Sequence, residues 1–175
     1  MKKQLSIKAL LQRISWLMLI LSIVPLIISV LIYTRYLFTY ERSISNISEA
    51  NRIANDVEEN IMEEAWSLTY GQTKPSEFTE SNSVRRVKKE IRQIKENTQS
   101  AQERATLNIV IRSLDNVNSF LEKIVGNVQQ DAPFNENQEL MNQVEAATKL
   151  VHDILQDFVT VEIQLAANHS EQVRR

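Results

Sequence analysis

The sequence has no cysteine, two glycines, three prolines and two histidines among its 175 residues. Without cysteine the chain forms no disulfide, no thiolate metal site and no cysteine nucleophile. So few glycines and prolines cannot supply the recurring tight turns of a many-stranded sandwich or barrel. Two isolated glycines build no glycine-rich phosphate loop. These absences favour a protein of long helices.

Acidic residues are absent from the N-terminal segment. Residues 1–35 carry five basic side chains and no acidic one, whereas the remainder holds 15 basic against 22 acidic residues, a net charge of −7. The total of −2 is therefore an average over two segments of opposite sign.

A long hydrophobic run, by contrast, is present. Between Arg13 and Arg35 lie 21 uncharged residues, ISWLMLILSIVPLIISVLIYT. At about 1.5 Å per residue this run spans about 30 Å, the thickness of the hydrocarbon core of a bilayer. It is longer than the apolar region of a signal peptide, and no Ala-x-Ala-like cleavage site follows it. We expect an uncleaved transmembrane helix over residues 14–36.

The basic residues before the span indicate its orientation. By the positive-inside rule, residues 1–13 are expected in the cytoplasm and residues 37–175 outside the cell, with the protein in the cell membrane and in contact with lipid. Pro25 removes one helix hydrogen bond and is expected to kink the span. The three serines of the span recur every seven residues and so share one face: Ser15, Ser22 and Ser29. They form either a packing seam between membrane helices or a chance pattern.

Beyond the span, apolar residues alternate at spacings of three and four in four tracts. The first comprises Tyr40, Ile44, Ile47, Ala50, Ala54, Val57, Ile61, Ala65 and Leu68. The second comprises Val84, Val87, Ile91 and Ile94, and the third Leu107, Val110, Leu114, Val117, Leu121, Ile124 and Val128. The fourth comprises Leu140, Val144, Ala147, Val151, Ile154, Phe158, Val161 and Leu165.

A helix with one apolar stripe buries it against other helices, and short connections favour antiparallel neighbours. The expected fold is all-α: an N-terminal transmembrane helix continues into an extracellular antiparallel four-helix bundle. The helices are expected at about 37–70, 79–98, 101–130 and 136–173, and the first ends at Gly71, a helix C-terminal residue. The stretch from Asn97 to Glu103 leaves one alternative open, in which the second and third tracts form a single bent helix.

No motif in the chain points to catalysis. The sequence has no HExxH helix, no Walker loop and no supported Ser-His-Asp arrangement, so we assign no catalytic residue and no metal site. The basic stretch RRVKKEIRQIK interleaves with core positions and is interpreted as a solvated helix face, not a nucleic-acid interface. His152 is interpreted as a flanking or solvated residue, and the acid pair Glu63 and Glu64 as a solvated face.

The segment IMEEAWSLTYG, residues 61–71, is the most informative local stretch. Trp66 lies beside the apolar stripe at the far end of the first helix. It either caps the bundle core or lines an apolar ligand pocket together with Tyr70 and Phe78, since such pockets occur between the helices of bundles.

Three parts of the chain outside the span carry a family resemblance. They are ISEANRIANDVEENI followed by EEAWSLTYG (47–61 and 63–71), IRSLDNVNSFLEKI (111–124) and ILQDFVTVEI (154–163). With the preceding anchor they resemble the membrane-anchored helical sensor region of YesM-type sensor histidine kinases of Gram-positive bacteria. In that family a second span, a HAMP relay and a kinase core follow the sensor.

The resemblance implies a homodimeric receptor that autophosphorylates on histidine and passes the phosphate to a cognate response regulator. Residues 1–175 contain no second span, HAMP segment or ATP-binding glycine boxes, so we expect either part of a longer receptor or a truncated reading frame. No cofactor is expected in this chain, and ATP is implied only for the absent kinase core. Two alternatives stay open: a chemoreceptor-type input domain, and a single-pass coiled-coil scaffold of the cell envelope that binds no ligand.

Overall fold

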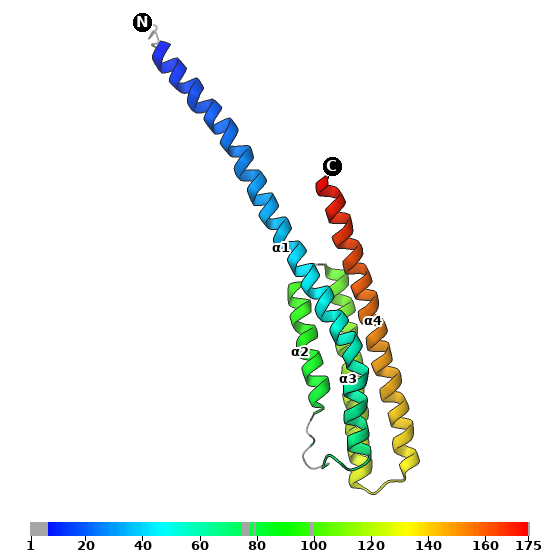
Figure 1. Cartoon of the computed structure of the whole chain (residues 1–175). Coiled ribbons are helices and arrows are strands. Elements are labelled where there is room, and N and C mark those ends of the chain that lie inside the picture. The colour runs from blue at the N-terminus through cyan, green and yellow to red at the C-terminus, as the bar shows by residue number, and fades with distance from the viewer. Residues whose placement is uncertain (1–6, 75–77, 79, 99, 175) are drawn as a thin grey trace. The chain divides into compact units, whose positions relative to one another are not determined.

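The part of the chain that the structure describes consists of helices and the short connections between them. A computed structural model describes residues 7–74, 78, 80–98 and 100–174, with side chains described from residue 11 to residue 167 within these ranges. It contains four helices, α1 (Ile7–Thr69), α2 (Asn82–Asn97), α3 (Ala101–Gln129) and α4 (Phe134–Arg174), and the described residues contain no strand (Figure 1). The all-helical prediction is confirmed. The predicted start of the second helix at residue 79 and the predicted N-terminal residues 1–6 lie outside the described residues.

The first part of α1 is the apolar segment predicted from the sequence. Contacts divide the chain into two compact units, Met1–Glu41 and Arg42–Arg175, and the division falls inside α1. In the first unit the large apolar side chains of the predicted span are exposed. Among the described residues, α1 is the one helix that is long and apolar enough to cross a membrane. Pro25 lies within α1, and the helix continues past it.

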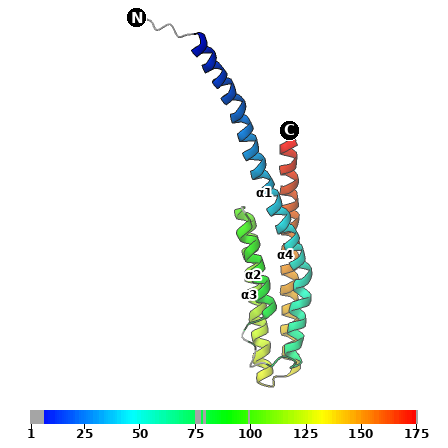
Figure 2. The ribbon, with the colours of Figure 1, turned by 60° about the vertical axis from the view of Figure 1, so that its left-hand side comes forward.

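The second unit is a helical bundle with one apolar core. α2, α3, α4 and the later part of α1 lie side by side in both views (Figures 1 and 2). All four helices contribute to the core: α1 through Ala54, Val57, Ile61 and Leu68, α2 through Val84, Val87, Ile91 and Ile94, α3 through Leu107, Val110, Leu114, Val117 and Leu121, and α4 through Val144, Val151, Leu155 and Phe158. The second and third predicted tracts lie in this core, apart from the half-buried Val128, and α3 also buries Val125, which the pattern omits. In the first tract the structure buries Ile53, which the pattern omits, and exposes Ile44.

Residue pairings between α1 and α4 run in reverse order. Ser43 is hydrogen-bonded to Glu162, the Asn51 and Gln156 side chains are 3.3 Å apart, and His152 lies 2.7 Å from the Ala54 carbonyl. α1 and α2 pair in the same reversed way, from Asn46 with Thr98 to Asn60 with Ser83.

Local capping chemistry determines where the helices end. At the end of α1, Gly71 has a φ of +69°, its N–H donates to the Leu68 carbonyl, and the N–H of Gln72 donates to the Ser67 carbonyl. This is a Schellman motif, which explains why a glycine follows the helix. α2 ends before Thr98, whose backbone is extended, and Ser100 caps α3. The second and third tracts are therefore separate helices, and the single bent helix is wrong.

The fourth helix buries a different stripe from the predicted one. Val144, Val151 and Phe158 are core residues as predicted, but Val161 and Leu165 are exposed. Leu140, Ala147 and Ile154 are half-buried. The other buried residues of this helix are Asn137, Met141, Thr148, Leu155, Val159 and Glu162. Two of the polar residues on this stripe have hydrogen-bond partners: the Thr148 hydroxyl donates to carbonyls of its own helix, and Glu162 accepts from Ser43. The third, Asn137, is buried with its side-chain oxygen unpaired.

Candidate functional site

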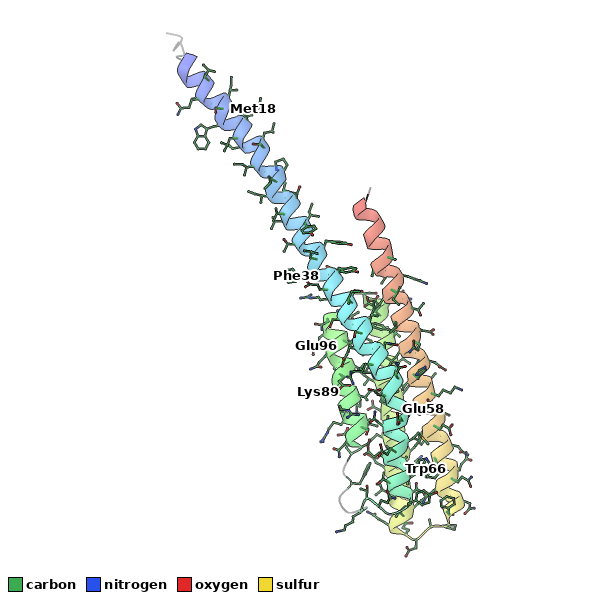
Figure 3. All side chains as sticks on the ribbon, in the orientation of Figure 1. Met18, Phe38, Glu58, Trp66, Lys89 and Glu96 are labelled. Atoms are coloured by element: carbon green, nitrogen blue, oxygen red, sulfur yellow. The ribbon has the colours of Figure 1, made fainter. Side chains whose placement is uncertain are left out.

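Three aromatic rings form a stack at one end of the bundle, where α1 leads toward α2 and α3 leads into α4. The Trp66 and Tyr70 rings, one turn apart on α1, are stacked with centroids 5.4 Å apart, and Tyr70 stacks in turn on Phe134 at 6.3 Å. Phe134 is the first residue of α4. Figure 3 shows Trp66 at this end of the bundle. We call Trp66, Tyr70 and Phe134 the aromatic stack.

The aromatic stack is open to solvent. Trp66, Tyr70 and Phe134 are 41%, 62% and 51% exposed. Of the three residues predicted to line a pocket, Trp66 and Tyr70 lie together. Phe78 instead packs, partly buried, against the apolar core. Phe134 was missed because it lies 64 residues beyond Tyr70 and belongs to no heptad tract. A ligand role for these residues stays a prediction.

Glu64 connects α1 to the first turn of α2. Its carboxylate accepts from the Ser81 hydroxyl and from the N–H groups of Asn82 and Ser83, at 2.9 to 3.1 Å. The first turn of a helix has free N–H groups and a partial positive charge, so a carboxylate there is favourable. The interpretation of Glu64 as a solvated residue is therefore wrong, whereas its neighbour Glu63 is exposed as expected.

His152 lies at the interface of α1 and α4. Its Nδ1 is 2.7 Å from the Ala54 carbonyl oxygen, and the side chain is half-buried. With Nδ1 protonated, the imidazole donates to this carbonyl. His152 therefore joins two helices and is not simply a solvated residue. No group of three or more His, Asp or Glu side chains that could hold a metal ion occurs in the described part of the chain.

Arg52 forms an ion-pair group on the bundle surface. Its guanidinium lies 2.6 Å from Glu49 on the same helix and 3.0 Å from Glu90 on α2. The hydrogen bonds from Arg52 lower the pKa of Glu49, and the two carboxylates raise the pKa of Arg52. All three groups are partly exposed, so this group contributes little to stability.

A polar cluster lies at the other end of the bundle, where α2 ends and α3 begins. Asn46, Thr98, Glu103 and Glu162 are buried there, and Ser43 is half-buried. The Asn46 amide donates to the Thr98 hydroxyl at 3.4 Å, and the Ser43 hydroxyl donates to Glu162. We call these five residues the polar cluster. One signal for it was present in the sequence: Ser100-x-x-Glu103 is a capping box, which predicts an ordered Glu103 side chain.

The predicted membrane-helix residues lie on the exposed apolar part of α1. Ser15, Ser22 and Ser29 are all exposed, and the Ser22 hydroxyl donates to the Leu19 carbonyl of the same helix at 3.0 Å. Their role in packing stays a prediction.

The chain was compared with family models, curated proteins and solved structures. None of them matches it. The function proposed below therefore depends on the chain's own residues and geometry and on the sequence resemblance described above.

Proposed function

We propose that this chain is the membrane-anchored extracellular sensor region of a two-component histidine kinase. In this proposal residues 14–36 span the membrane, residues 1–13 are cytoplasmic, and the bundle is an antiparallel four-helix sensor domain outside the cell. The resemblance to YesM-type kinases suggests the output: a kinase core elsewhere in the receptor uses ATP, and a response regulator receives the phosphate.

The observation that carries the proposal is the composition of α1. One helix contains both an exposed apolar segment of membrane-spanning length and the core residues Ala54, Val57 and Ile61. A shift of core packing around these residues therefore acts on the same helix that enters the membrane. Heptad-packed helices have discrete alternative arrangements, which suits them to such a shift.

Contacts between α1 and α4 support a signalling role for this pair. Three polar contacts, from Ser43 with Glu162 to Ala54 with His152, join residues 43–54 of α1 to residues 152–162 of α4. In a receptor of the proposed type, α4 leads toward the second span, so α1 and α4 are the two helices that connect the sensor to the membrane.

We further propose that the receptor is a homodimer in the lipid bilayer. The face formed by Ser15, Ser22 and Ser29 is the candidate seam, since small residues allow close approach of membrane helices, and Pro25 lies on the same segment. The exposed aromatic stack is the candidate contact surface for a ligand, with Phe134 added to the predicted residues Trp66 and Tyr70.

A chimeric receptor tests the proposal without knowledge of the ligand. Residues 1–175 are joined to the second span, HAMP relay and kinase core of a YesM-type kinase, and cysteines replace Asn51 and Gln156. Cross-linking this pair with a short bismaleimide holds α1 against α4. The expected result is a several-fold change in autophosphorylation on cross-linking.

The matched control uses cysteines in place of Lys88 and Asp115, whose side chains are 2.6 Å apart between α2 and α3. Cross-linking this pair is expected to leave autophosphorylation unchanged. Equal phosphorylation before and after the α1–α4 cross-link would instead favour the scaffold alternative.

A further inference from the structure

The polar cluster contains two buried carboxyl groups and no basic residue. Glu103, near the start of α3, and Glu162, on α4, are each 6% exposed. The rest of the buried interior is formed mainly by apolar side chains. Burying an ionised carboxylate is costly unless it is paired and fully hydrogen-bonded.

The hydrogen bonds of the cluster leave one carboxyl oxygen unsatisfied. Glu162 accepts from the Ser43 hydroxyl, and Glu103 is held by a hydrogen bond from the Ser100 backbone. Oε1 of Glu103 is buried and has no hydrogen-bond partner. An ionised carboxylate is destabilised when one of its oxygens is buried without a hydrogen-bond donor, which favours the protonated form of Glu103.

The groups around Glu103 favour the protonated form of its side chain. Burial raises the pKa of Glu103, the negative charge of Glu162 raises it further, and the Ser100 hydrogen bond lowers it. The other helices contribute uncharged groups here, Ser43 and Asn46 from α1 and Thr98 after α2.

The charged residues near this level of the bundle are turned to solvent or paired. Glu49 is bonded to Arg52. Arg42, Glu96 and Arg104 are exposed, and Lys95 is half-exposed. Glu96 projects from α2 away from the other helices (Figure 3). In the described part of the chain, the charge that acts on Glu103 is therefore that of Glu162.

We propose that Glu103 and Glu162 form a binding site for a single proton, which makes the packing of α4 at this end of the bundle depend on pH. With the proton bound, the Glu103 carboxyl group is neutral and the charge of Glu162 no longer opposes a charge on it. When the proton leaves, two negative charges share a buried site, and like charges at short range in a medium of low polarity repel strongly.

The sequence of α4 offers a second packing that removes this repulsion. One position before each of the buried residues Met141, Thr148, Leu155 and Glu162 lies an apolar residue, and these four are spaced seven apart: Leu140, Ala147, Ile154 and Val161. Val161 is 40% exposed in the structure. A rotation of α4 by about one heptad position, roughly 50°, would bury Val161 and expose Glu162 to water.

The proposed proton site does not depend on a signalling function of the chain. Within the proposed function, it would make pH an input of the sensor, because the polar cluster lies on α1 and α4, the two helices proposed to connect the bundle to the membrane.

Thermal unfolding of the full chain in detergent micelles tests the proton site. Above pH 4.5, the ordinary pKa of this carboxyl group, the unfolded chain has released a proton that the folded chain retains, so stability falls as pH rises. A one-proton difference lowers Tm by about 3–5 °C per pH unit within the titration for a chain of this length. Between pH 5 and pH 8, the Tm of Glu103→Gln is expected to fall by less than the Tm of the unmodified chain, because a neutral amide has no proton to release.

The matched control is Glu145→Gln, an exposed residue of α4. It is expected to keep the pH dependence of the unmodified chain. The lowered pKa of Glu49 acts below pH 4.5 and so lies outside this window. Identical Tm profiles for Glu103→Gln and the unmodified chain would overturn the proposal.

A labelling experiment tests the rotation in the folded protein. Because the chain has no cysteine, Val161→Cys introduces a single thiol, and Ser119→Cys, at an exposed position of α3, corrects for the effect of pH on thiol reactivity. The ratio of maleimide labelling rates, position 161 over position 119, is expected to fall several-fold from pH 5 to pH 8. In the Glu103→Gln background it is expected to stay constant. A ratio that does not change in the unmodified background would contradict the rotation of α4.

Discussion

Two adjacent glutamates of α1 have very different surroundings. Glu63 and Glu64 are adjacent on α1 and have the same side chain. Glu63 is exposed, whereas Glu64 accepts three hydrogen bonds at the start of α2. Helical spacing alone cannot distinguish them, because the partner of Glu64 is brought near by the turn between α1 and α2, not by α1 itself.

Replacing Glu64 tests this difference. Glu64→Ala removes the acceptor for two backbone N–H groups and for the buried Ser81 hydroxyl, so the unfolding free energy is expected to fall by about 1–2 kcal/mol. The measurement is urea unfolding followed by circular dichroism. Glu63→Ala is the control and is expected to change stability by less than about 0.5 kcal/mol. Equal losses for the two variants would show that Glu64 does not stabilise the start of α2.

At the scale of helices, sequence periodicity predicted α2 and α3 well and α4 only in part. The core contains every residue of the apolar stripes predicted for α2 and α3 except the half-buried Val128. In α4 the apolar residues cover two neighbouring stripes that share Val144, Val151 and Phe158. The buried stripe includes Thr148 and Glu162, which a search for apolar residues rejects. Thr148 is hydrogen-bonded to a carbonyl one turn earlier on its own helix. Glu162 is hydrogen-bonded to Ser43, 119 residues away, and such a distant partner cannot be inferred from local spacing.

The buried stripe and the stripe predicted from the sequence differ in which of two adjacent residues of α4, Ile154 or Leu155, contributes more to stability. Leu155→Ala creates a cavity at a fully buried site and is expected to cost about 2–5 kcal/mol. Ile154→Ala removes a half-buried side chain and is expected to cost clearly less. Chemical denaturation of both variants measures the difference. If Ile154→Ala were the more destabilising change, the stripe inferred from the sequence would be the correct one.

The candidate site was predictable only where it depends on one helix. Trp66 and Tyr70 are four residues apart on α1, which places them on one face. Their third partner, Phe134, comes from the start of α4, so only the arrangement of helices reveals it. Likewise, the capping box predicts an ordered Glu103, but not that Glu162 of α4 is also buried in the polar cluster.

At the scale of the whole molecule, the account depends on the separation of charge and hydrophobicity along the chain. Residues 1–35 are basic and contain the apolar run, and the remainder carries the net charge of −7. The structure supplies a helix that can cross a membrane and a helical bundle with its own core. A sensor requires that the bundle lie outside the cell while residues 1–13 remain inside.

Cysteine accessibility in intact cells tests this arrangement most directly. Ser119→Cys places a thiol on the exposed surface of α3, and Ser6→Cys places one before the span, in a chain without other cysteines. With a membrane-impermeant maleimide, the thiol at position 119 is expected to react in intact cells and the thiol at position 6 only after permeabilisation. The opposite labelling, or labelling of neither thiol before permeabilisation, would contradict an extracellular sensor.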